Sequence, residues 1–174
     1  MALLRGINLG ASRRVPMGEL RERLRSAGHP EARTYLQSGN IVLDSGAEPE
    51  QLGAELTAQL AEWFGLDVPV VVRAAAELDA VVAANPLAGV AENSKYYVVT
   101  FLDREPDPDA VSRLVELARD GEQLVHSGRE IYVWHPLGQG RSKLALGLSS
   151  AKLGVLATAR NWTTVTALAE MARA

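Results

Sequence analysis

The chain has 174 residues, of which 47% are hydrophobic and 22% charged, which is enough apolar material for one good core or two small ones. It contains no cysteine, which excludes disulfide and thiolate chemistry and favours a reducing, cytoplasmic location. The net charge of −3 lacks the basic excess of most non-specific nucleic-acid binders, and the sequence shows neither a membrane-spanning apolar run nor a signal-peptide pattern.

The first half of the sequence predicts a strand, a helix, two strands, a helix and a strand, followed by an extra helix. Pro16 suits the first turn of a helix, and Gly28 is a typical stop. Ser38, Gly39 and Asn40 separate two β-prone runs, which indicates a hairpin. The expected strands are 2–7, 31–37, 41–44 and 68–73, and the expected helices are 16–27, 48–64 and 74–84.

The second half predicts the same order again. A helix beginning at Asp107 should carry Val111, Leu114, Val115 and Ala118 inward. A second hairpin is indicated around Ser127, Gly128 and Arg129, which parallels the first one. The expected strands are 95–102, 123–126, 130–135 and 155–159, and the other expected helices are 142–153 and 164–174.

The repeated order predicts an α+β fold of two tandem ferredoxin-like βαββαβ units, each followed by an extra helix. The two predicted domains are 1–90 and 91–174, with the boundary in the segment 85–94. The parallel between the halves favours an internal duplication.

Four motifs follow one another along almost the whole chain: LLRGIN at 3–8, RTYLQSGN at 33–40, RSKL at 141–144 and ATARNW at 157–162. In this combination the sequence resembles the bacterial domain-of-unknown-function family 1697. The resemblance implies an α+β fold with ferredoxin-like units. It supplies no activity, substrate or catalytic residue, so the catalytic residues are unknown.

The predicted topology brings the first two motifs together. In a βαββαβ unit the end of the first strand, the start of the first helix and the first hairpin share one edge of the sheet. We therefore expect Asn8, Arg13 or Arg14, and the segment 38–40 to converge there. The free N–H groups at a helix start favour an anion, arginine is a bidentate donor, and amides orient polar ligand atoms.

The last two motifs should form a second cluster. We expect Arg141, Lys143, Arg160, Asn161 and Trp162 to gather where the helix near Ser142 begins and the last strand ends. Two arginines, a lysine and an indole near a helix start are suited to an anion or to base stacking.

Each of these residues also has an ordinary structural interpretation. The residues of the first hairpin fit a turn without any ligand. Asn161 or Thr163 is a natural cap for the last helix, and tryptophan is commonly half buried. Arg5 lies in a strand, where it faces solvent, pairs with a carboxylate or contacts an anion.

The three histidines have no metal-ligand spacing, and the motifs contain neither histidine nor carboxylate for acid–base chemistry, so neither a metal nor a cofactor is expected. The favoured prediction is that the Arg- and Asn-rich loop edges bind an anionic ligand, either an anionic small molecule such as a nucleotide or a nucleic acid. The alternatives are an enzyme acting on a phosphorylated or carboxylated small molecule, and a structural or interaction protein, for which a homodimer is one partner to consider. No membrane partner is expected. The predicted ligand-binding residues are Arg5, Asn8, Gln37, Ser38, Asn40, Arg141, Lys143, Arg160, Asn161 and Trp162.

Overall fold

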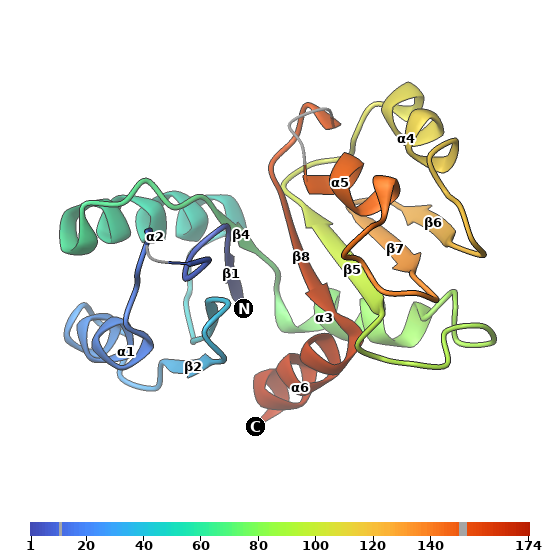
Figure 1. Ribbon diagram of the computed structural model, residues 1–174. Coiled ribbons are helices and arrows are strands. Elements are labelled where there is room, and N and C mark those ends of the chain that lie inside the picture. Colours follow the sequence, from blue (N-terminus) through green and yellow to red (C-terminus); the bar gives the residue numbers. More distant parts are fainter. Residues whose placement is uncertain (11, 150–152) are drawn as a thin grey trace. The chain divides into compact units, whose positions relative to one another are not determined.

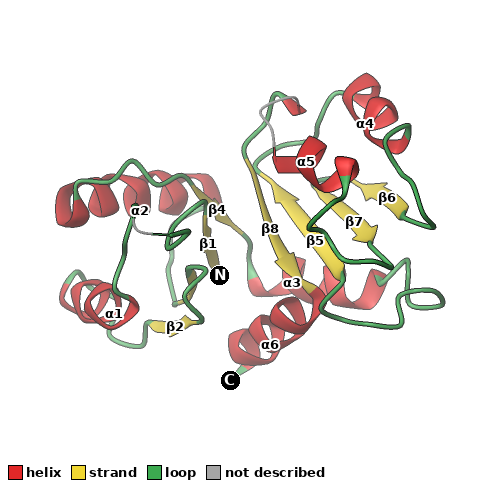
Figure 2. Ribbon diagram, in the orientation of Figure 1, coloured by secondary structure: helices red, strands yellow, loops and turns green. Residues whose placement is uncertain are grey.

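The protein is a mixed α+β structure with two four-stranded antiparallel sheets (Figures 1 and 2), which confirms the predicted class. The computed structural model describes residues 1–10, 12–149 and 153–174. Within these residues, no helix is both long enough and apolar enough to cross a membrane.

The first sheet is formed by the N-terminal part of the chain. The elements in order are β1 (Ala2–Leu4), α1 (Met17–Ser26), β2 (Arg33–Tyr35), β3 (Asn40–Val42), α2 (Pro49–Phe64), β4 (Val70–Val72) and α3 (Ala75–Ala84). The strands lie in the order β2-β3-β1-β4, and all neighbours are antiparallel. Strand β1 ends earlier than the predicted residue 7 because the chain turns at Gly6, whose φ is +65°.

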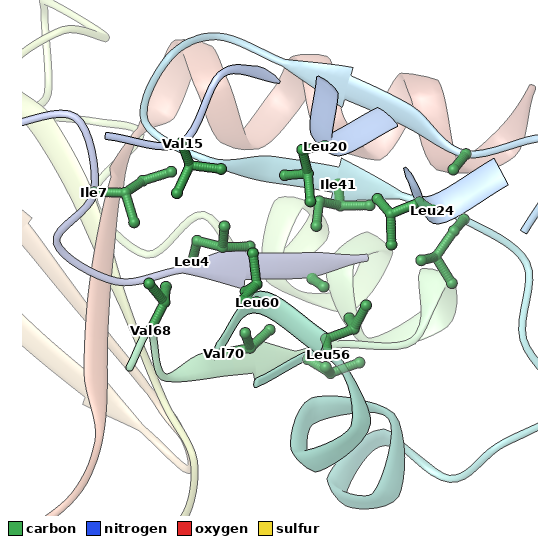
Figure 3. Packing of buried hydrophobic residues seen from close by; sticks show 14 of the residues in the cluster. Leu4, Ile7, Val15, Leu20, Leu24, Ile41, Leu56, Leu60, Val68 and Val70 are labelled. Carbon is green, nitrogen blue, oxygen red and sulfur yellow. The ribbon is translucent and has the colours of Figure 1, made fainter. Parts of the chain in front are cut away.

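One face of this sheet packs against α1 and α2. Alternate residues of β1, β3 and β4 point into the core because successive side chains of a strand face opposite sides. Figure 3 shows Leu4, Ile41 and Val70 from the strands meeting Leu20 from α1 and leucines 56 and 60 from α2. The buried leucines of these helices, Leu20 and Leu24 of α1 and Leu52, Leu56 and Leu60 of α2, recur every four residues, as a helix with one buried face requires.

The second sheet repeats this arrangement. The second half of the chain contains, in order, β5 (Tyr97–Leu102), α4 (Pro108–Val115), β6 (Gln123–Ser127), β7 (Glu130–Trp134), α5 (Lys143–Ser149), β8 (Ala157–Asn161) and α6 (Trp162–Arg173). The strand order is β6-β7-β5-β8, again fully antiparallel. Of the helix predicted at 142–153, residues 150–152 lie outside the described residues.

Helices α4 and α5 pack on one face of the second sheet. Leu114 of α4 and Leu144 and Leu148 of α5 join Ile131 and Val133 of β7 in this core. The prediction that Val115 points inward is wrong, because this side chain is 52% exposed at the last residue of α4. Leu117, which follows the helix, packs against the core instead.

Boundaries that differ from the prediction at the last strand, the last helix and the first hairpin affect candidate site residues. The last strand is Ala157–Asn161 instead of 155–159, so Arg160 and Asn161 pair with β5. Helix α6 then begins at Trp162 without a connecting loop. In the first hairpin, Asn40 belongs to β3 and pairs with Tyr35, so the turn is formed by 36–39.

The contacts divide the chain into two compact units, residues 1–78 with 168–174, and residues 79–167. This division falls inside α3 and inside α6. The domain limits 1–90 and 91–174 remain a prediction about independently folding parts of the chain.

Candidate anion-binding hollow

A hollow of about 600 Å³ lies in the second unit, between the segment that precedes β6 and the segment that leads into α5 (both elements are labelled in Figure 1). Its walls come from two loops that are distant in sequence. The lining residues are Arg119, Asp120, Glu122, Leu137, Gly138, Gly140, Arg141, Ser142 and Lys143. We call this site the α5 hollow.

Three cations line the α5 hollow. Arg141 and Lys143 are exposed, and their side chains make no hydrogen bond or ion pair with any residue in the described part of the chain. The Arg119 guanidinium donates to the carbonyl oxygens of Glu116 and Ala118, at 2.7 and 2.6 Å, which fixes its position. Two of the three positive charges therefore have no partner among the residues that the structure describes.

The Glu122 carboxylate forms the inner wall of the α5 hollow and ties three segments together. Oε2 accepts the backbone N–H of Arg119 at 3.2 Å, and Oε1 accepts Nδ1 of His135 at 2.6 Å. The Ser142 hydroxyl also donates to this carboxylate. Burial acts to raise the pKa of Glu122. The hydrogen bonds to its carboxylate, of which that from Ser142 has the largest effect, lower this pKa below its ordinary value. An ionised carboxylate with three donors is a weak general base.

His135 lies directly behind Glu122, where its side chain is 1% exposed. Its backbone N–H donates to the carbonyl of Tyr96 at 3.0 Å, and its own carbonyl accepts the N–H of Gly138 at 2.9 Å. Nε2 is buried and has no hydrogen-bond partner among the residues that the structure describes. Among the described residues, Glu122 is therefore the one hydrogen-bond partner of the imidazole.

Ser142 links Glu122 to the start of α5. Its hydroxyl oxygen accepts the N–H of Ala145 at 2.9 Å, in the manner of a helix N-cap, while its proton is directed to the carboxylate. The flanking residues Arg141 and Lys143 are thereby held at the rim of the α5 hollow.

The structure separates the rest of the predicted second cluster from the α5 hollow. Arg160 is 7% exposed and donates to Thr158 Oγ1 and to the carbonyl of Ala159, at 2.9 and 2.7 Å. Burial lowers the pKa of its guanidinium to about 10. Because the side chain is enclosed by the fold, we assign Arg160 a structural role, in place of the predicted ligand contact.

Asn161 and Trp162 are also used by the fold. The Asn161 side chain accepts the N–H of Thr164 at 2.9 Å and so caps α6, as its ordinary interpretation predicts. Trp162 stacks on Tyr97, with ring centroids 4.7 Å apart and an interplanar angle of 17°. Neither residue lines the α5 hollow.

In the first unit, the structure brings Asn8 against the first hairpin. Its Nδ2 donates to the carbonyls of Gln37 and Val15, at 2.8 and 3.0 Å, and its Oδ1 accepts the N–H of Val15 at 2.9 Å. This side chain thus uses its hydrogen-bonding capacity to brace a backbone in which Asn8 has a φ of +54°.

Asn40 and Ser38 brace the same hairpin from inside. Asn40 is fully buried, and its Nδ2 donates to the carbonyl of Tyr35 at 2.7 Å and to Ser38 Oγ at 3.1 Å. The Arg13 guanidinium donates to the carbonyls of Gly6 and Asp67, at 3.0 and 2.7 Å. These residues of the motifs are positioned by hydrogen bonds within the chain itself.

A smaller hollow of about 360 Å³ remains beside them, lined by Asn8, Gly10, Arg14, Val15, Pro16 and Gln37. Arg14 and Gln37 are exposed, and the side chain of neither makes a hydrogen bond with another described residue. Arg5 is half buried and likewise makes no side-chain hydrogen bond within the described part of the chain. This hollow therefore offers one cation, Arg14.

Sequence reasoning does not single out Arg119 and Glu122, which line the α5 hollow, or His135, which lies behind Glu122. None of them belongs to a motif, and the spacing of the histidines gives no indication of a metal site that would include His135. Glu122 and His135 are 13 residues apart and meet only through the pairing of β6 with β7. The two residues lie one position beyond the Gln123–Trp134 pair, so the register of the predicted second hairpin is the signal that could have revealed this contact.

Comparisons with known proteins agree with the fold. The family model described as "Protein of unknown function (DUF1697)" matches residues 1–132. Among solved structures, the conserved bacterial protein SP0830 from Streptococcus pneumoniae is similar, with a TM-score of 0.74 and 24% sequence identity over 98% of this chain and 96% of that chain. No curated protein matches.

Proposed function

The chain belongs to the family of proteins of unknown function named DUF1697, and we propose that it binds an anionic ligand in the α5 hollow. One observation carries this proposal. Arg141 and Lys143, two exposed cations without a partner among the described residues, line one hollow together with Arg119. Arginine offers a planar pair of donors to phosphate or carboxylate, and lysine adds a point charge.

The other hollows of the molecule support an anion less well. A hollow of about 480 Å³ in the first unit carries Arg33 and Arg73, but Glu31 and Asp44 also line it. The hollow beside Asn8 has a single cation. In the α5 hollow Arg119, Arg141 and Lys143 outnumber the two carboxylates, Asp120 and Glu122, so the balance is positive even with Glu122 ionised.

Apolar surface at the rim favours a nucleotide over a simple ion. Leu137 lines the α5 hollow and is 80% exposed. Tyr96 is 40% exposed, and its ring lies against Gly138, where an added Cβ would approach the ring to 3.5 Å. Aromatic and apolar side chains beside cations suit a phosphate attached to a flat base.

A mononucleotide is favoured over a nucleic-acid strand because the cations are confined to one hollow. Proteins that bind nucleic-acid strands usually present a basic stripe, and the net charge of this chain is −3. Arg5 and Gln37 in the first unit stay predicted ligand contacts, since both are open to a partner.

We also propose that both units are ferredoxin-like and arose by duplication. The element order βαββαβ occurs twice, and the strand order β2-β3-β1-β4 has its counterpart in β6-β7-β5-β8. The two sheets correspond strand by strand: β5 has the same position in its sheet as β1, and β8 has the same position as β4.

The test is calorimetric titration of the full chain with adenosine monophosphate, inorganic phosphate and a short single-stranded RNA. We expect the mononucleotide to bind and Arg141→Ala to weaken its binding roughly tenfold, because one charge-assisted hydrogen bond is lost. Arg113→Ala is the matched control, since Arg113 is an exposed arginine on α4 that does not line the hollow. Equal effects of the two variants, or no binding by the wild-type chain, would contradict the proposal. Tighter binding of RNA than of the mononucleotide would identify a nucleic acid as the ligand.

A further inference from the structure

We infer that the buried pair of Glu122 and His135 couples anion binding in the α5 hollow to the protonation of His135, so that the anion is held more tightly when the imidazole is charged. The inference rests on the proposed function and adds its regulation. It assigns roles to two residues that no sequence motif includes.

The geometry places the pair where its charge acts on the ligand. The Glu122 carboxylate lines the α5 hollow itself, and His135 Nδ1 lies 2.6 Å from it on the protein side. The side chains of the two residues are 8% and 1% exposed. Charges buried to this degree are weakly screened by solvent, so their effect reaches a neighbouring bound ion.

The state of His135 sets the net charge beneath the ligand. With a neutral imidazole the pair carries the single negative charge of Glu122, which opposes an anion. With an imidazolium the pair is neutral, and Arg119, Arg141 and Lys143 act on the anion without opposition from the inner wall. Since Glu122 accepts from Nδ1, the proton is gained at Nε2, which has no partner among the described residues.

The other charged groups around the pair do not provide the same response. They are Arg119 and Asp120 before β6, and Arg141 and Lys143 before and at the start of α5. The carbonyl of Tyr96 holds the backbone of His135 from the β5 side. Histidine is the side chain whose ordinary titration falls between about pH 5 and 8, so a pH response of the hollow in that range identifies the imidazole.

The coupling is reciprocal, which allows it to be measured from either side. Protonation of His135 should tighten anion binding about tenfold, within the usual range for coupled sites. A saturating anion should by the same factor move the titration midpoint of His135 up by about one pH unit. Sulfate is the suitable probe, because its own charge does not change over this range.

The experiment is an NMR titration of the histidine ring protons of the full chain from pH 5 to 8, with and without sulfate. We expect the midpoint of His135 to move, while those of His29 and His126 stay in place. These two serve as internal controls, because His29 lies in the first unit and His126 contacts the carbonyl of Gly128 in the β6–β7 hairpin. Calorimetry with sulfate at pH 5.5 and pH 8 should give the matching difference in affinity.

The outcomes separate this inference from the proposed function. If neither sulfate nor adenosine monophosphate binds, the proposed function fails. The coupling is refuted, while the site stands, by any of three results: sulfate binds with equal affinity at the two pH values, all three histidines move together, or His135 does not titrate. His135→Gln should remove the pH dependence and His126→Gln should retain it. Because His135 is buried, the titration of the wild-type chain decides the question should that variant not fold.

Discussion

Two arginines of the sequence motifs, Arg141 and Arg160, lie in opposite environments at the scale of the single residue. Arg141 is exposed and makes no bond within the described chain, whereas Arg160 is 7% exposed and donates to Thr158 and Ala159. An exposed arginine without a partner is available to a ligand. A buried one stabilises the fold by satisfying acceptors that water does not reach.

The first prediction follows from this contrast. Arg160→Ala should lower the free energy of unfolding by about 2 kcal/mol, because it leaves buried acceptors unpaired and opens a cavity. Anion affinity should be unchanged, since Arg160 does not line the α5 hollow. Urea unfolding and calorimetry on Arg160→Ala and Arg141→Ala check this. A stable Arg160→Ala protein with reduced affinity would return Arg160 to the binding site.

At the scale of the element, the first hairpin is held by backbone geometry and close packing. The turn 36–39 contains Leu36, with a φ of +56°, and Gly39, with a φ of +78°. Gly39 is also buried against β1 and the loop after it, since its carbonyl accepts the N–H of Leu4 at 2.9 Å. An added Cβ at Gly39 would lie 2.6 Å from Ile7 Cδ1 and 2.8 Å from Leu4 Cβ.

Gly39→Ala should therefore destabilise the protein by about 2 kcal/mol or more, through the positive φ and through overpacking. Gly10→Ala is the matched control, because Gly10 has a φ of +82° but nothing lies within 4 Å of its added Cβ. We expect a loss of about 1 kcal/mol for the control. Thermal unfolding of both variants measures the difference, and equal losses would show that the close contact costs nothing.

At the scale of the whole molecule, the proposed site opposes the overall charge. The net charge of −3 repels an anion from a distance, while Arg119, Arg141 and Lys143 attract it locally. Salt distinguishes the two effects, since the screening length falls from about 10 Å at 0.1 M to about 3 Å at 1 M.

The expected result is that 1 M sodium chloride weakens binding of adenosine monophosphate several-fold relative to 0.1 M, because contact with the cations dominates. Calorimetry at the two concentrations measures this. Stronger binding at high salt would mean that the overall negative charge controls the encounter and that the cations of the α5 hollow contribute little. The Arg113→Ala chain should retain the salt response of the wild type.

Much of the fold follows from local patterns in the sequence. The stripe of leucines in 48–64 predicts α2, and the observed helix is Pro49–Phe64. The β-prone runs around 38–40 predict the first hairpin, although Asn40 pairs as a strand residue. Errors arise at ends of elements, as with Val115 and β8, because the final turn or pair depends on what packs there.

The candidate site was predicted in part. Arg141 and Lys143 were singled out from sequence, and the structure places both in the α5 hollow. Arg160, Asn161 and Trp162 were expected beside them but serve the fold. The type of a residue does not reveal its burial, so an arginine in a motif is consistent with either role.

The sequence by itself determined the α+β class, the order of elements, the two hairpins and the family. These properties depend on periodicity, turn residues and short motifs, which act over a few neighbouring positions. Only the tertiary structure decided which cations face a hollow, and that the Glu122–His135 pair is buried beneath it. The reason is physical: burial and long-range contact are set by the pairing of strands and the packing of helices on them, and no single segment of the chain carries that information.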